Sequence, residues 1–125
     1  MSSILVIEDS AEMRLMLEQT LVAAGYEVRT AEDGRQATAL CAQKTPDLVI
    51  TDIYMPNKDG LEMIMELRAN SPLTRIIAIS GQLTHKNMLP VAHTLGAVRT
   101  LAKPFEPQEL LKAVREVLQP SSKHS

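Results

Sequence analysis

The chain has 125 residues, which is long enough to bury one hydrophobic core. Its formal net charge of −2 and its pI of about 5.9 give no electrostatic reason to expect binding to nucleic acid or to an anionic membrane. No apolar run approaches the roughly 20 residues of a membrane-spanning helix, and the first residues lack the basic segment of a signal peptide. The single cysteine, Cys41, excludes an internal disulfide, so we expect a cytoplasmic domain.

Short runs rich in β-branched and aliphatic residues predict five strands. They are Ile4–Ile7, Tyr26–Thr30, Leu48–Thr51, Ile76–Ile79 and Val98–Ala102. Three of these runs are almost continuously apolar, which is the pattern of parallel strands covered on both faces.

Helical patterns separate the strands. Apolar residues recur at spacings of three and four within residues 13–24, 37–41, 61–67 and 110–118, and end signals place a further helix at about residues 88–95. Ser10 can cap the first helix and Gly25 can end it. Asn87 can cap the fourth helix and Gly96 can end it.

Strands that alternate with helices predict an α/β domain with a doubly wound, five-stranded parallel sheet and helices on both faces. We expect this domain to cover residues 1–120, with residues 121–125 as a polar tail. In such sheets the functional site lies beyond the carboxyl ends of the strands.

Polar side chains stand at four of these predicted strand ends. Glu8 and Asp9 follow the first strand, Asp52 the third, Ser80 the fourth and Lys103 the fifth. Each of them alone is as easily explained as a cap or a solvated loop residue. Together they are more informative, because the fold brings distant residues to one edge of the sheet.

Three carboxylates in one place repel one another unless a cation neutralises them. Mg²⁺ suits such a place, because it takes one or two carboxylates and leaves positions for phosphate oxygens. Lys103 adds a point charge for a phosphoryl oxygen, and an Asp can act as a nucleophile toward phosphorus. This combination indicates phosphoryl transfer, which depends on positioning and charge neutralisation.

With these motifs the chain resembles the receiver domains of response regulators, the CheY-like modules of two-component signalling. The resemblance extends from Ile4 to Leu118. It rests on an acidic pair after the first strand, Asp-x-x-Met-Pro after the third, Ser-Gly after the fourth and Lys-Pro-Phe after the fifth. It implies a flavodoxin-like sheet with the strand order 2-1-3-4-5, the order known for CheY.

The resemblance also implies a phosphoacceptor and a metal site. Asp52 matches the residue that accepts the phosphoryl group in this family. Asp9 matches the direct Mg²⁺ ligand of the acidic pair, and Glu8 matches its partner, which often acts through water. The backbone carbonyl of Tyr54 matches the remaining protein ligand.

Further residues match the machinery around the acceptor. Lys103 matches the lysine that contacts the phosphoryl group, and Ser80 matches the hydroxyl that turns toward it after modification. The peptide bond before Pro104 is usually cis in this family. Pro56 and Gly60 are expected to shape the loop beside the metal.

One residue departs from the family pattern. Thr100, three residues before Lys103, stands where receivers often have Tyr or Phe, an aromatic that swings inward as the serine or threonine moves. Thr100 cannot fill that space. We therefore expect phosphorylation without the usual aromatic switch, with coupling through the loop after Ser80 and the helix of residues 88–95.

The function implied is transfer of a phosphoryl group from a sensor histidine kinase or phosphotransfer domain to Asp52. The domain is then not an enzyme in the usual sense, although self-phosphorylation from small donors and self-dephosphorylation are expected. Its signal passes to a downstream effector protein or an output domain, and family analogy leaves a homodimer open.

Three alternatives stay open at this point. The chain could be the receiver half of a longer regulator with a DNA-binding output domain, or a pseudo-receiver that works without phosphorylation. It could also be an enzyme on a similar fold. A haloacid dehalogenase-like phosphatase usually needs a second Asp two residues after the nucleophile, where this chain has Tyr54. A flavodoxin needs a first loop rich in hydroxyls and glycine, where this chain has Glu8 and Asp9.

Overall fold

A computed structural model of the chain describes residues 2–53, 60–80 and 96–119. Its elements follow in the order β1 (Ser3–Ile7), α1 (Ala11–Ala23), β2 (Glu27–Ala31), α2 (Gly34–Gln43), β3 (Leu48–Asp52), α3 (Gly60–Asn70), β4 (Arg75–Ser80), β5 (Arg99–Ala102) and α5 (Pro107–Leu118). All five predicted strands are confirmed, with bounds that move by one residue. The helix expected at residues 88–95, the tail of residues 121–125, Tyr54 and Pro56 lie outside the described residues.

The strands form one parallel sheet in the order β2-β1-β3-β4-β5, as predicted. Because all five strands run the same way, the sheet has two distinct edges. We call the edge where the strands end the carboxyl-end edge, and it carries Glu8, Asp52, Ser80 and Lys103. The opposite, amino-end edge carries Ser3, Asp47 and Thr74, which precede or begin strands.

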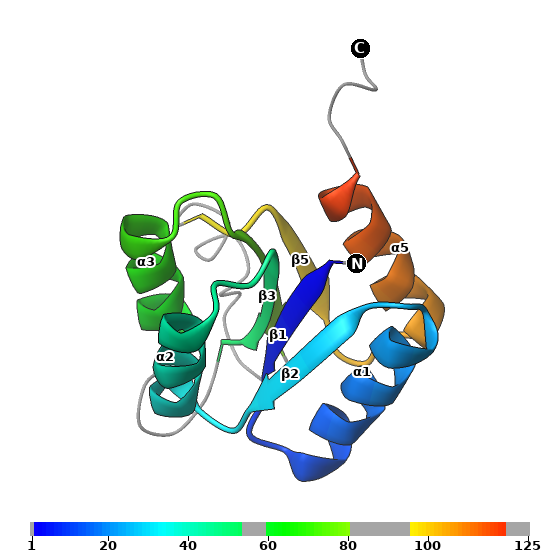
Figure 1. The fold of residues 1–125 in the computed structure, drawn as a ribbon. Helices are drawn as coiled ribbons and strands as arrows, with labels where there is room; N and C mark the ends of the chain where they lie inside the picture. Colours follow the sequence, from blue (N-terminus) through cyan, green and yellow to red (C-terminus); the bar gives the residue numbers. More distant parts are fainter. Residues whose placement is uncertain (1, 54–59, 81–95, 120–125) are drawn as a thin grey trace.

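Helices cover both faces of the sheet, so the molecule has three layers (Figure 1). Alternate residues of each strand point to opposite faces. In β1, Ile4 and Val6 pack with α1 and α5, while Leu5 and Ile7 pack with α2 and α3. All four side chains are at most 1% exposed. This burial on both faces explains the almost unbroken apolar runs of the central strands.

Local signals in the sequence place the helix ends. The Ser10 Oγ accepts a hydrogen bond from the Met13 N–H at 3.3 Å and so caps α1. The chain leaves α1 through Gly25, whose φ of 98° favours glycine. Asp33 caps α2 by accepting from the Gln36 N–H at 3.0 Å. None of the helices in these described segments is long and apolar enough to cross a membrane.

Candidate functional site

Three carboxylates meet at the carboxyl-end edge, as the sequence predicted. Glu8, Asp9 and Asp52 each offer an oxygen atom, and these oxygens lie within 4.8 Å of one another. Glu8 and Asp9 come from the loop after β1, and Asp52 ends the neighbouring strand β3. Glu8 is 1% exposed and Asp52 is 5% exposed, whereas Asp9 faces solvent. We call these three residues the acidic cluster.

Lys103 reaches the acidic cluster from the end of β5. Its Nζ lies 2.9 Å from the Asp52 Oδ2 and 3.2 Å from the Glu8 Oε1. The backbone holds the base of this side chain, because the Lys103 N–H donates to the Ser80 carbonyl at 2.8 Å. The peptide bond from Lys103 to Pro104 is cis, which is the isomer that the resemblance implied.

The charges of this site are unequal, because one ammonium group faces three carboxylates. Burial raises the pKa of Glu8 to about 7 and the negative charge of Asp52 adds to this shift, whereas the Ser10 N–H and Lys103 oppose it. Burial alone would lower the pKa of Lys103, but the hydrogen bond and charge of Asp52 and the charge of Glu8 raise it overall. The site therefore carries an excess of negative charge that a second cation would neutralise.

The donor set fits a hard divalent cation. Carboxylate oxygens at this spacing are the ligands that such ions prefer, and no nitrogen or sulfur ligand is part of the set. The buried position of Glu8 beside Asp52 supports the same conclusion, because a metal ion would offset the burial and the repulsion from Asp52 that raise the pKa of Glu8. The acidic cluster can thus hold a metal ion.

The backbone around Glu8 is anchored on both sides. The Glu8 N–H donates to the Ala31 carbonyl at 3.0 Å, which extends the pairing of β1 with β2. The Glu8 carbonyl accepts from the Arg14 Nη1 at 2.8 Å, and the Glu8 Oε2 accepts from the Ser10 N–H at 3.1 Å. These contacts fix both the main chain and the carboxylate of Glu8.

Arg14 is the residue at this site that the sequence reasoning missed. It lies in the first turn of α1, six residues after Glu8. A signal was present, because a cation near the start of a helix is opposed by the helix dipole and so indicates a role outside the helix. The partner of Arg14 could not be read from that signal.

The remaining predicted residues lie around the acceptor. Ser80 ends β4, is 4% exposed and pairs in register with Ala102, immediately before Lys103. Thr100 is half-buried in the middle of β5, opposite Ala78. Gly60 is the first residue of α3. The described residues thus include the predicted acids, Ser80, Thr100 and Lys103, whereas Tyr54 and Pro56 lie outside the described ranges.

Comparison with known proteins agrees with this arrangement. A family model described as "Response regulator receiver domain" matches residues 4–115. The chemotaxis protein CheY of Bacillus subtilis is 36% identical over 116 residues, which are 92% of this chain and 96% of that protein. The probable transcriptional regulator ycf27 of Guillardia theta is 38% identical over 122 residues, which are 96% of this chain and 46% of that protein.

Among solved structures, the chain likewise resembles one protein of about its own length and one that is much longer. The chemotaxis protein CheY4 of Vibrio cholerae superposes with a TM-score of 0.86 at 37% identity, over 94% of this chain and 99% of that one. NtrX of Brucella abortus superposes with a TM-score of 0.87 at 30% identity, over 94% of this chain and 26% of that one. The chain thus spans about half the length of the ycf27 regulators and nearly the whole of the CheY proteins.

Proposed function

The chain belongs to the response regulator receiver domains of two-component signalling, and from that membership we propose that Asp52 is its phosphoacceptor. One observation carries the proposal: a nearly buried carboxylate, hydrogen-bonded to the Lys103 ammonium, lies beside two further carboxylates at the edge where parallel sheets place their sites. Carboxylates can act as nucleophiles and carry a phosphoryl group as an acyl phosphate. The arrangement supports this role for Asp52.

The proposal assigns Mg²⁺ to the acidic cluster, with Glu8, Asp9 and Asp52 as ligands and the carbonyl of Tyr54 as a further ligand. When bound, Mg²⁺ supplies positive charge for the oxygens of the incoming phosphoryl group. The protein contributes the placement of the carboxylates. Glu8 is held by the Ser10 N–H and by Lys103, and Asp52 is held by Lys103.

In the proposed reaction, a carboxylate oxygen of Asp52 attacks the phosphorus of a phosphohistidine on a histidine kinase or phosphotransfer domain. The new O–P bond forms as the P–N bond breaks, and the electron pair of that bond stays on the imidazole nitrogen. Lys103 is placed to donate to a phosphoryl oxygen, because its Nζ already lies 2.9 Å from the Asp52 Oδ2. Acetyl phosphate would react in the same way, with acetate as the leaving group.

After transfer, we propose that the Ser80 hydroxyl contacts the phosphoryl group and that the loop following it changes conformation. Ser80 is suited to this role because it ends β4 beside the base of Lys103. Thr100 lacks the ring that receivers often have at this place, so the change would spread through the residues after Ser80. The altered surface would pass the signal to an effector protein or an output domain, in the cytoplasm.

Intact-mass spectrometry after incubation with acetyl phosphate tests this function. We expect a phosphoryl adduct on the wild type with Mg²⁺, and no adduct with EDTA or on Asp52→Ala. Asp47→Ala is a matched control, because Asp47 precedes the same strand, β3, at its other end. An equal adduct on Asp52→Ala would contradict the assignment. A wild type that neither acetyl phosphate nor a kinase labels would instead be a pseudo-receiver.

A further inference from the structure

The peptide unit between Glu8 and Asp9 sets the direction in which the chain enters Asp9. A peptide unit is planar, so the orientation of the Glu8 carbonyl fixes the orientation of the Asp9 N–H and of the bond that leads to the Asp9 Cα. That carbonyl accepts a hydrogen bond from the Arg14 Nη1 at 2.8 Å. Arg14 therefore holds the one peptide unit that joins two members of the acidic cluster.

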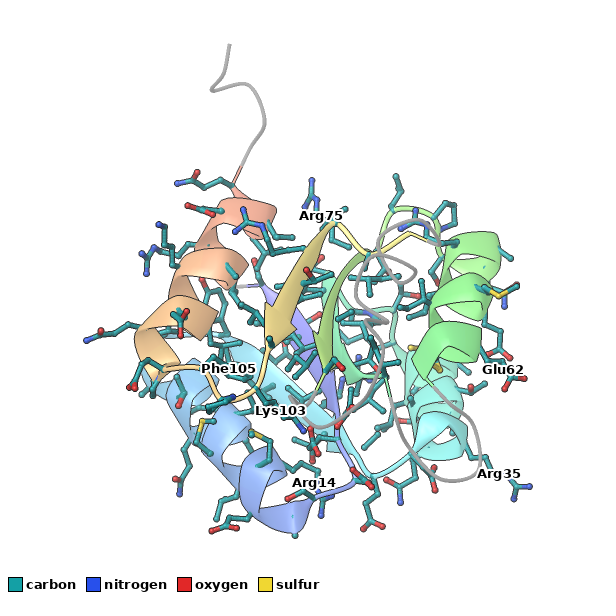
Figure 2. The ribbon with its side chains drawn as sticks, turned by 180° about the vertical axis from the view of Figure 1, so that it is seen from behind. Arg14, Arg35, Glu62, Arg75, Lys103 and Phe105 are labelled. Carbon is teal, nitrogen blue, oxygen red and sulfur yellow. The ribbon has the colours of Figure 1, made fainter. Side chains whose placement is uncertain are left out.

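The second guanidinium nitrogen of Arg14 has a weaker contact. This atom, Nη2, lies 4.0 Å from the Glu32 Oε2, and the Arg14 side chain is 19% exposed. Glu32 follows β2, and its own N–H donates to the Gln36 Oε1 at 2.8 Å. The Glu32 side chain is 62% exposed, so this ion pair contributes little energy, and the hydrogen bond to the Glu8 carbonyl is the stronger contact of the guanidinium. Figure 2 shows Arg14 and Lys103 at the same end of the molecule, away from Arg75, which begins β4.

We propose that Arg14 is a positioning residue for the metal site: it fixes the Glu8–Asp9 peptide so that the Asp9 carboxylate stays beside Asp52. The inference rests on the proposed role of the acidic cluster. Arg14 donates to the backbone carbonyl of Glu8, so this contact leaves the carboxylate oxygens of the cluster to the cation and to Lys103. Asp9 depends most on this contact, because its side chain faces solvent and is not held by packing.

A purely structural role is the competing explanation, and the chain offers a matched control for it. Arg29, on β2, also donates to two backbone carbonyls, those of Leu40 at 2.9 Å and Lys44 at 2.7 Å. These carbonyls belong to the carboxyl end of α2 and to its cap, and not to the loops of the acidic cluster. Arg29→Met removes hydrogen bonds from an arginine to backbone carbonyls but leaves the contacts of the loop of Glu8 and Asp9 in place.

Isothermal titration calorimetry with Mg²⁺ tests the proposal on the wild type, Arg14→Met, Arg14→Lys and Arg29→Met. We expect Arg14→Met to raise the Kd for Mg²⁺ about tenfold, as is usual when a residue that orients a metal ligand is lost. Arg14→Lys should fall between Arg14→Met and the wild type, because lysine keeps a donor but not the planar fork. Arg29→Met should leave the Kd within about twofold of the wild type. Urea unfolding in EDTA gives the stability of each variant for comparison.

The dependence of the acetyl phosphate reaction on Mg²⁺ is a second readout. For Arg14→Met, the half-saturating Mg²⁺ concentration should rise by the same factor as the Kd, while the rate at saturating Mg²⁺ stays within about twofold of the wild type. An Arg14→Met Kd equal to that of the wild type, or an equal loss in Arg29→Met, would overturn the positioning role and leave the proposed function intact. A wild type that does not bind Mg²⁺ would overturn both.

Discussion

The two edges of the sheet both hold polar groups among buried strands, but they balance these groups differently. At the amino-end edge, the Ser3 N–H donates to the Asp47 Oδ2 at 2.8 Å, and the Asp47 N–H donates to the Ser3 carbonyl at 2.9 Å. The Thr74 Oγ1 donates to the Pro46 carbonyl at 2.9 Å. Donors and acceptors are matched there. At the carboxyl-end edge, three carboxylates face one ammonium group, that of Lys103.

We propose that this difference separates a structural edge from a functional one. Polar groups that satisfy one another stabilise the fold and need no ligand. A partly buried excess of one charge costs free energy, and proteins keep such an arrangement where a ligand or a reaction uses it. The acids of the two edges should therefore respond to substitution in opposite ways.

The largest effect is expected for Lys103→Met in metal-free solution at pH 8. The substitution removes the ammonium group that contacts the buried carboxylates of Glu8 and Asp52, so the free energy of unfolding should fall by about 3 kcal/mol. Urea unfolding measures this change, and Mg²⁺ should restore part of it. Lys112→Met, at an exposed position of α5, is the control. A loss no larger than that of the control would show that Lys103 does not hold the acidic cluster together.

Glu8→Gln should stabilise the metal-free protein, with an effect that depends on pH. The pKa of Glu8 is about 7 in the folded protein against an ordinary 4.5, so the folded state binds the proton more tightly. The free energy of unfolding of the wild type therefore falls as the pH rises from about 4.5 to 7. Glutamine carries no charge, so the advantage of Glu8→Gln should grow over this range to about 3 kcal/mol.

Thermal or urea unfolding in EDTA at pH 5 and pH 8 checks the Glu8→Gln prediction. Mg²⁺ should reverse the order at pH 8, because only the wild type keeps the full set of carboxylate ligands. A Glu8→Gln variant that is less stable than the wild type at pH 8 without metal would contradict the prediction. It would mean that the ionised Glu8 carboxylate stabilises the fold, as the Asp47 carboxylate does.

The smallest effect is expected at the amino-end edge. Asp47→Ala removes the acceptor of the Ser3 N–H, so the free energy of unfolding should fall by about 1 kcal/mol, while the Kd for Mg²⁺ stays unchanged. Chemical denaturation and Mg²⁺ titration check the two parts. An increase in stability on loss of Asp47 would remove the contrast between the edges.

Much of the fold follows from the sequence for identifiable reasons. The strands are predictable because both of their faces are buried, as the full burial of Leu48, Val49 and Ile50 illustrates. The convergence of Asp52 and Lys103 follows from the rule that parallel strands end at one edge. The strand order did not follow from periodicity and came from the resemblance to receiver domains.

Other features depend on side-chain geometry that the sequence does not encode locally. Adjacent residues of an extended chain point to opposite sides, so Glu8 and Asp9 meet different surroundings. Which of the two turns inward depends on the bend after β1, and the structure buries Glu8. The contact of Arg14 with the Glu8 carbonyl likewise depends on the packing of α1 beside β1 and β2. Residues that position a site are harder to predict than residues that form it.

We propose that Asp47, which precedes β3, only stabilises the fold, whereas Asp52, which ends β3, is the phosphoacceptor. The most direct test is to locate the phosphoryl group. Borohydride reduction converts a phosphorylated Asp to homoserine, and the tryptic peptide of residues 45–58 contains both Asp47 and Asp52. We expect homoserine at residue 52, only after reaction with Mg²⁺ present, and unchanged Asp at residue 47. Homoserine at any other position, with residue 52 unmodified, would contradict this expectation.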